Sequence, residues 1–362
     1  MTYKRCKTLP SIVLFTVFLL FTSFQSVLAE ISDGIRTTDY FLTHTSIDPF
    51  YEKHNLDPTV VLHIREVVMA GREGTVSKEG KVLVLVHGAT LPGVVAFDVD
   101  YKNVSLMRHF AQAGWDTFAL ELEGYGSSTR PMSMDAPAAF SDDPAPVRAD
   151  VAVADVARVV DFVRELRGVD KVHMLGWSLG ATVEVPRYAI QQPDKLTTIV
   201  LMCGNYKGWN TSEEEMKKRV DNYNKQKIRL GYPASIQGWG SLGTKEEFVI
   251  PGAFEAYSKA HLASDPKSGE LGGAIRAPLG RFVDMTLEEP HFDAAKITTP
   301  TLVIRGEFDS FATKKDNMAL LEALGSEVKE LVEIPASGHF LHFEKNNLEL
   351  YRALETFLES NK

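Results

Sequence analysis

The chain of 362 residues is poor in cysteine, with only Cys6 and Cys203. Cys6 lies in an N-terminal segment that we expect to be removed, so one cysteine is left in the mature chain. A single cysteine cannot form an internal disulfide, which excludes a small fold held together by disulfides. If the chain is exported, this cysteine usage fits a bacterial periplasm or medium better than a disulfide-rich eukaryotic secretome.

Excess positive charge is also missing. The chain has 39 lysines and arginines against 48 aspartates and glutamates, for a formal net charge of −9. No basic stripe stands out along the sequence. An acidic chain without such a stripe is not expected to bind nucleic acid, because binding needs cations that neutralise phosphates.

Sequence patterns that bind metal ions are missing too. Neither an H-E-x-x-H motif nor paired cysteines at zinc-binding spacing occurs. We therefore predict neither a metal ion nor another cofactor.

The first 29 residues have the pattern of a secretory signal peptide. A head with three positive charges precedes an apolar stretch at residues 11–24 and a small-residue cleavage site that ends at Ala29. We predict cleavage after Ala29 and a secreted or periplasmic mature protein without a membrane span. Losing three positive charges takes the net charge from −9 to −12. The alternative is an uncleaved membrane anchor, because residues 9–28 could nearly span a bilayer.

Strand-like and helix-like segments alternate from Lys81 to Cys203. Residues 81–87 form a near-continuous apolar run, which is typical of a strand buried on both faces. Residues 149–167 are the clearest helix, with valines on one face and Gly168 at the end. The alternation predicts a mainly parallel sheet with helices on both faces.

The composition changes between residues 206 and 290. This segment is polar and loses the strand rhythm, so we interpret it as an inserted, mostly helical cap. The rhythm returns afterwards. We therefore predict a core in two parts, residues 30–205 and 291–362, with residues 30–58 as a loosely packed lead-in.

The motif Gly176-Trp177-Ser178-Leu179-Gly180 lies between a predicted strand and a predicted helix. A strand that reverses directly into a helix holds the serine of G-x-S-x-G at the tip of a strained bend. Glycines are needed on both sides because the strand and helix leave no room for a Cβ. Backbone N–H groups at the start of the helix point at whatever the serine attacks.

Three further motifs accompany this elbow. His87-Gly88-Ala89 and Gly306-Glu307-Phe308-Asp309 each follow a predicted strand, and Ser337-Gly338-His339 precedes the last predicted helix. From about residue 59 onward the chain resembles the α/β-hydrolase superfamily, whose motifs occur in this order. The resemblance implies an α/β-hydrolase fold, with a mostly parallel eight-stranded sheet flanked by helices and a helical cap insertion.

The resemblance also implies a catalytic triad of Ser178, Asp309 and His339. A serine hydroxyl is a poor nucleophile and needs a base at hydrogen-bond distance. A histidine, whose reference pKa is about 6.5, can accept the proton and return it to the leaving group. The aspartate would fix the tautomer of the imidazole. The backbone N–H groups of Leu179 and Ala89 are implied as the oxyanion hole.

Some of these residues allow a second interpretation. Asp309 could simply cap the helix that follows it, because aspartate is a favoured N-cap. His342 lies close enough in sequence to His339 to be a rival base. Arg130 and Arg148, which flank a long loop, could bind a substrate carboxylate or lie in solvent.

The sequence says little about the substrate. We expect Trp177 and Leu91 at the floor of a pocket, and cap aromatics such as Trp209 and Trp239 in an apolar roof. Our leading interpretation is a secreted serine hydrolase that cleaves small carboxylic esters through an acyl-enzyme. The same triad could instead serve a proline iminopeptidase-like amidase or a lactone or carbon–carbon bond hydrolase. A non-catalytic binding protein with this fold is a further alternative.

Overall fold

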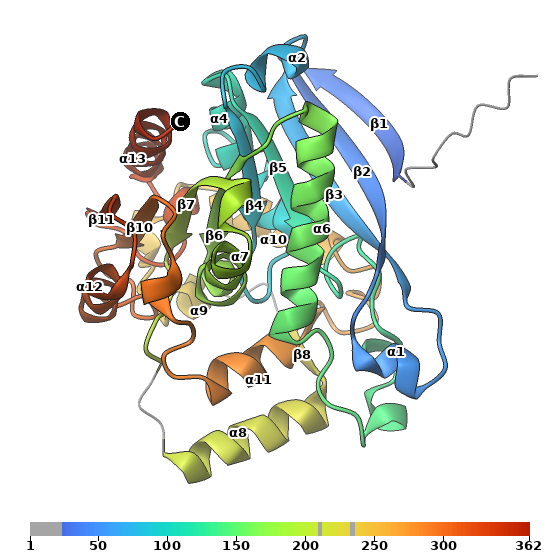
Figure 1. The fold of residues 1–362 in the computed structure, drawn as a ribbon. Coiled ribbons are helices and arrows are strands. Elements are labelled where there is room, and N and C mark those ends of the chain that lie inside the picture. Colours follow the sequence, from blue (N-terminus) through green and yellow to red (C-terminus); the bar gives the residue numbers. More distant parts are fainter. Residues whose placement is uncertain (1–23, 209–211, 232–235) are drawn as a thin grey trace, which may run out of the picture.

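A computed structural model describes residues 24–208, 212–231 and 236–362. Its largest element is a nine-stranded sheet with the order β1-β2-β3-β5-β4-β6-β7-β10-β11 (Figure 1). Strands β1, β2, β3 and β5 are joined antiparallel, and all pairs from β5 to β11 are parallel. The strands are β1 (Phe24–Ser32), β2 (Ile35–Thr45), β3 (Thr59–Met69), β4 (Val82–Val86), β5 (Asp116–Glu121), β6 (Val172–Trp177), β7 (Leu196–Met202), β10 (Thr301–Gly306) and β11 (Lys329–Ile334).

The sheet has nine strands, whereas eight were predicted, and the chain before residue 58 supplies two of the nine at one edge. β2 pairs with β3 along its full eleven residues, and β1 folds back on β2. Residues 30–58 are therefore not a loose lead-in. β2 is buried on one face only. Because the residues of its other face are largely polar, the segment was not recognised as a strand from the sequence. The predicted cleavage after Ala29 would leave only residues 30–32 of β1.

The central strands are buried on both faces, as predicted. In β4, Leu83 and Leu85 face a core that includes α4 (Leu106–Gln112) and α13 (Asn347–Ser360). Val84 faces a second core that includes α6 (Ala149–Arg167) and α7 (Val185–Gln191). Helices thus cover both faces of a mainly parallel sheet, which confirms the predicted fold class (Figure 1).

The remaining helices of this layer are short or peripheral. They are α1 (Pro49–Lys53), α2 (Glu73–Val76), α3 (Gly93–Phe97), α5 (Met132–Asp135) and α12 (Lys314–Ala323). Among residues 24–208, 212–231 and 236–362, no helix is both long enough and apolar enough to span a membrane.

Between β7 and β10 the chain leaves the sheet and forms the segment that was predicted as a cap. Its elements are α8 (Glu213–Gln226), β8 (Ile228–Gly231), α9 (Ile236–Gly240), α10 (Ala253–Ala263), β9 (Ile275–Pro278) and α11 (Gly280–Leu287). The antiparallel pair β8–β9 was not expected from the sequence. Helix α8 packs against α11 below the sheet in Figure 1. The domain boundaries at residues 206 and 290 stay a prediction.

Candidate active site

Ser178 lies at a sharp bend between β6 and a short π-helical turn at Gly180–Glu184. Its φ angle is 55°, in the left-handed region that non-glycine residues rarely occupy. A Cβ on Gly176 would lie 2.6 Å from the carbonyl carbon of Gly180, and a Cβ on Gly180 would lie 2.5 Å from the carbonyl oxygen of Val86. The two glycines are therefore required by the close approach of neighbouring backbone, as the motif predicted.

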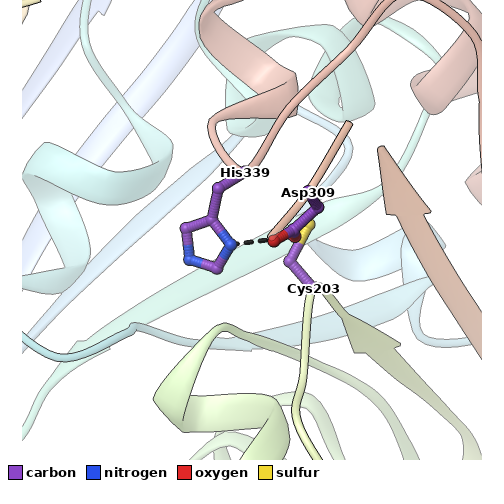
Figure 2. Close-up of side chains that lie close together, drawn as sticks. All are labelled: Cys203, Asp309 and His339. Atoms are coloured by element: carbon purple, nitrogen blue, oxygen red, sulfur yellow. Dashed lines mark hydrogen bonds and ion pairs between the residues drawn. The ribbon is translucent and has the colours of Figure 1, made fainter. Parts of the chain in front are cut away.

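The structure brings the three predicted triad residues together. Nε2 of His339 lies 2.9 Å from Oγ of Ser178, and Nδ1 of His339 lies 2.9 Å from Oδ2 of Asp309. An ionised carboxylate only accepts hydrogen bonds, so Nδ1 carries the proton and Nε2 is free to accept from the serine hydroxyl. Figure 2 shows His339 and Asp309 facing each other. All three residues are buried.

Asp309 is held ionised by its surroundings. Oδ1 accepts hydrogen bonds from the backbone N–H groups of Phe311 (2.8 Å) and Ala312 (3.0 Å), which leaves Oδ2 for His339. Burial favours the neutral acid, but the positive charge that His339 carries when protonated, together with the hydrogen bonds, outweighs burial and lowers the pKa of Asp309. The alternative role as a helix cap does not apply, because the side chain of Thr313 caps α12.

Cys203, at the end of β7, lies directly beside Asp309 (Figure 2). Burial and the neighbouring charge of Asp309 raise the pKa of the Cys203 thiol well above its usual value, so the thiol stays protonated and donates to Asp309. Sγ, a carboxylate oxygen of Asp309 and a ring nitrogen of His339 lie within 4.8 Å of one another. Nδ1 of His339 and Oδ2 of Asp309 are already bonded to each other, so these two groups form the carboxylate–imidazole link of the triad.

The loop after β4 passes directly against the elbow. A Cβ on Gly88 would lie 2.9 Å from Cβ of Ser178. Ala89 and Leu179, the two residues implied as oxyanion donors, both line the cavity into which Ser178 and His339 open. Leu179 precedes the first turn of the helix, where an N–H group has no partner within the helix.

Comparison with known proteins agrees with this arrangement. A family model described as "alpha/beta hydrolase fold" matches residues 81–346, which is well over half of the chain. The chain belongs to the α/β-hydrolase family. No curated protein sequence matches this α/β-hydrolase at a significant level.

Solved structures share its fold at low sequence identity. An esterase from Thermogutta terrifontis, with malate bound, is 16% identical with a TM-score of 0.58, covering 88% of this chain and 98% of its own. A monoacylglycerol lipase from Paleococcus ferrophilus is 19% identical, with a TM-score of 0.57 and coverages of 83% and 99%. A 2-hydroxy-6-oxo-6-phenylhexa-2,4-dienoate hydrolase from Rhodococcus is 16% identical, with a TM-score of 0.53 and coverages of 82% and 94%. At these identities the likeness shows the fold alone.

His342, the rival of His339, does not reach the serine of this α/β-hydrolase. Its ring packs against Trp177, with 4.8 Å between ring centroids, and against Phe343 at 4.5 Å. Burial, together with the positive charge available on His339, lowers the pKa of His342 to about 3. It is therefore a neutral packing residue at physiological pH, and His339 is the histidine at Ser178.

A cavity of about 570 Å³ lies over Ser178 and is lined in part by residues of the inserted segment from α8 to α11. Leu91 and Trp239, two of the four predicted substrate contacts, line it. Tyr257 and Phe282 add further aromatic surface. Trp239, Tyr257 and Phe282 come from the inserted segment, and their contact with a substrate stays a prediction.

The other two predicted substrate contacts, Trp177 and Trp209, are not found in the lining of the cavity among the described residues. Trp177 does not lie among the described residues that line the cavity; its indole N–H donates to the carbonyl oxygen of His339 at 3.1 Å. It packs behind the imidazole instead of forming the pocket floor, because the strand end buries its side chain. Trp209 lies outside the described residues.

The two arginines considered as carboxylate binders are engaged in structural contacts. Arg148 forms an ion pair with Asp284 of α11, with Nε donating to Oδ1 at 2.9 Å. Arg130 donates to the carbonyl oxygen of Gly126 at 2.7 Å. Instead, Arg219 and Arg229 line the cavity. Among its described lining residues there is no aspartate or glutamate.

Sequence reasoning missed one residue beside the oxyanion loop, Arg281 of α11. It is fully buried and donates from Nη2 to the carbonyl oxygen of Gly88 at 2.7 Å. Nothing in the local sequence singles it out, since its partner precedes it by 193 positions. Its neighbour Tyr125 comes from the turns that follow β5.

Proposed function

We propose that this α/β-hydrolase is a secreted serine hydrolase that cleaves carboxylic esters of small molecules through an acyl-enzyme. The observation that carries the proposal is the hydrogen-bonded line from Ser178 through His339 to Asp309, with both links at 2.9 Å. The line opens into an apolar cavity large enough for a small ester.

In the proposed reaction, Oγ of Ser178 attacks the ester carbonyl carbon while its proton moves to Nε2 of His339. The tetrahedral intermediate collapses, the bond to the alcohol oxygen breaks, and Nε2 gives its proton to the leaving alcohol. Water then attacks the acyl-enzyme with His339 again as base, releasing the acid and free Ser178. Asp309 stays ionised and stabilises the imidazolium at both steps.

The oxyanion of each intermediate is proposed to bind the N–H groups of Ala89 and Leu179. Both residues border the cavity beside Ser178. Loss of one such donor typically costs about 3 kcal/mol of transition-state stabilisation.

The charges around the cavity favour an ester over an amino-terminal amide. An aminopeptidase of the proline iminopeptidase type needs a carboxylate for the substrate amine, and the described lining offers arginines instead. The acidic run Glu213–Glu215 lies exposed at the start of α8, where Glu215 pairs with Arg219 at 2.6 Å. These residues act as a solvated helix start and not as an amine site.

The proposed export rests on the N-terminal sequence pattern. Cleavage after Ala29 would remove the first part of β1 and leave residues 30–32 paired with residues 35–37 of β2. The mass of the exported protein tests this, and a chain that begins at Glu30 is the expected result. An intact N-terminus in the membrane fraction would show the uncleaved anchor instead.

A substrate panel tests the proposed bond. Purified wild type and Ser178→Ala are assayed with p-nitrophenyl esters, a prolyl p-nitroanilide and a vinylogous diketone. We expect ester turnover by wild type only. Turnover of the amide or diketone without ester turnover would overturn the assignment of the bond while leaving the triad in place.

A fluorophosphonate probe tests whether the site is catalytic at all. Wild type should be labelled and Ser178→Ala should not. Ser241→Ala is the matched control, because Ser241 lines the same cavity but its hydroxyl donates to the carbonyl of Gly238 at 2.7 Å. A folded wild type that takes no label would indicate a non-catalytic binding protein.

A further inference from the structure

Arg281 connects the inserted segment to the loop that carries Ala89. It comes from α11, has no exposed surface, and donates from Nη2 to the carbonyl oxygen of Gly88 at 2.7 Å. Its Nη1 lies 3.3 Å from Oε1 of Glu184, which is equally buried in the turn that follows Ser178. One guanidinium thus contacts both the oxyanion loop and the nucleophile turn.

The carbonyl of Gly88 is held from two sides. Besides Arg281, Nδ1 of His87 lies 2.8 Å from the same oxygen. A carbonyl oxygen is acceptor only, so this nitrogen donates, and Nε2 of His87 accepts from the N–H of Leu122 at 3.3 Å. Burial, together with the charge of Arg281, lowers the pKa of His87 to about 3, which keeps the ring neutral.

Fixing this carbonyl also fixes an N–H group. The C=O of Gly88 and the N–H of Ala89 belong to one planar trans peptide unit and point in opposite directions. The donors of Arg281 and His87 therefore determine where the N–H of Ala89 points. This peptide lies close to the nucleophile, because a Cβ on Gly88 would lie 2.9 Å from Cβ of Ser178. A small rotation of the peptide would therefore change the direction in which the N–H of Ala89 points relative to the reacting atoms.

Tyr125 holds the next carbonyl in the same loop. Its hydroxyl donates to the carbonyl oxygen of Ala89 at 2.5 Å, and its ring lies 4.5 Å from that of His87. Burial raises the pKa of Tyr125, so the hydroxyl remains a donor. Nη2 of Arg281 lies 3.5 Å from this hydroxyl. Consecutive peptide units of the loop are thus held by one connected group of side chains.

Stability alone gives a weak reason for this arrangement. Removing two charges from water usually costs as much as their attraction returns, so a fully buried ion pair rarely adds net stability. Burial raises the pKa of Glu184 to about 7 even though Arg281 acts in the opposite direction. The contact that distinguishes Arg281 from an ordinary buried ion pair is its bond to the oxyanion loop.

We propose that Arg281 is a positioning residue for the oxyanion hole: by holding the carbonyl of Gly88, it directs the N–H of Ala89 at the oxyanion. This inference rests on the proposed serine hydrolase function. It makes the hole complete only when α11 is packed against the sheet, and so couples the inserted segment to the chemistry at Ser178.

The test compares Arg281→Met with Arg281→Lys and with a matched control, Arg148, which comes from the start of α6 and contacts the same helix α11. Arg148→Met removes the ion pair that anchors α11 through Asp284 but leaves the bond to Gly88 intact. The readouts are kcat and KM for a p-nitrophenyl ester, and inhibition by a trifluoromethyl ketone, which forms a tetrahedral oxyanion on the serine. Hydrogen exchange of a peptide that covers residues 87–91 reports on the loop without requiring turnover.

For Arg281→Met we expect kcat to fall by about 10- to 100-fold, less than the loss of a whole oxyanion donor, with KM changed by less than about twofold. Affinity for the ketone should fall by a similar factor, and residues 87–91 should exchange faster. Arg281→Lys, which keeps a cationic donor, should recover part of each effect. Arg148→Met should lower thermal stability, with a much smaller fall in kcat than in Arg281→Met, because the bond from Arg281 to Gly88 is kept.

Equal losses of thermal stability in Arg281→Met and Arg148→Met, with unchanged kcat per labelled serine, would overturn the proposal. If Arg281→Met does not fold, Arg281→Lys and Tyr125→Phe carry the test, and unchanged kcat and exchange in both would contradict it. The two hypotheses fail differently. A wild type without fluorophosphonate labelling or turnover refutes the hydrolase, whereas loop exchange unaffected by Arg281→Met refutes the positioning role.

Discussion

The indole N–H of Trp177 donates to the backbone carbonyl of His339 at 3.1 Å. This bond joins the last residue of β6, next to the nucleophile, to the loop that carries the base. Trp177, which we expected in the substrate pocket, therefore helps to set the distance between Ser178 and His339.

Trp177→Phe tests this role. The change removes the N–H and keeps an aromatic ring, so we expect a loss of about 1 kcal/mol in the free energy of unfolding. We also expect kcat to fall several-fold with little change in KM, because Trp177 does not line the described part of the cavity. Trp239→Phe is the comparison, since Trp239 does line it and should mainly raise KM. A raised KM with unchanged kcat in Trp177→Phe would indicate that Trp177 contacts the substrate and does not position His339.

Gly88→Ala tests the close approach of the oxyanion loop to the nucleophile. The added Cβ would lie 2.9 Å from Cβ of Ser178, so the loop must move away from the elbow. We expect kcat/KM to fall by about 100-fold, similar to the loss of an oxyanion donor. Gly74→Ala, where nothing lies within 4 Å of the new Cβ, should leave kcat/KM unchanged. Full activity in Gly88→Ala would show that the oxyanion loop can move away from Ser178 without affecting catalysis.

Cys203 should be chemically inert in the folded protein. Burial and the charge of Asp309 raise the pKa of its thiol, and only the thiolate reacts with disulfide reagents and alkylating agents. We expect no reaction with Ellman's reagent at pH 8 in buffer and stoichiometric reaction in denaturant. Rapid labelling of the native protein, accompanied by loss of activity, would mean that the region beside Asp309 opens to solvent.

His63 should give the folded protein a pH-dependent stability. It is buried, which disfavours its charged form, but hydrogen bonds and charges from Asp39 and Glu121 outweigh burial and raise the pKa of His63 to about 9. In the unfolded chain the pKa returns to about 6.5. The stabilisation is therefore complete below about pH 6.5 and is lost as the pH rises toward 9, because the folded state binds the extra proton.

Urea unfolding from pH 6 to 9.5 measures this contribution. The free energy of unfolding should decrease over this range with a slope of at most about 1.4 kcal/mol per pH unit from this one group. His63→Gln, which keeps hydrogen-bond donors but cannot titrate, should show a shallower decrease. Parallel curves for the two proteins would contradict the assignment.

The central strands and the site motifs could be predicted because they are determined by nearby residues. The apolar run at residues 81–87 has no polar face, and the helix at Ala149–Arg167 ends at Gly168, whose φ of 62° suits the left-handed C-cap. The elbow needs its glycines for the same kind of local reason. Hydrophobic periodicity, helix capping and the need for glycine at a close backbone approach can all be recognised from a few neighbouring residues in the sequence.

Other features depend on partners that lie far away in the sequence. β2 is half buried, so only its pairing with β3 shows that it is a strand. Arg281 resembles any other helix arginine until the fold places it at Gly88. The position of Pro186 also depends on more than its neighbours. A π-helical turn at Gly180–Glu184 precedes it and places it in the first turn of α7, where a missing N–H costs nothing.

The most direct test of the account is the mass of the protein during turnover. Wild type is mixed with a slowly hydrolysed p-nitrophenyl ester, quenched in acid within the first turnovers, and analysed intact and after digestion. We predict a mass increase of one acyl group, located on Ser178 and missing from Ser178→Ala, with His339→Gln acylated far more slowly. Ester hydrolysis that continues in Ser178→Ala, or an acyl group found on another residue, would contradict it.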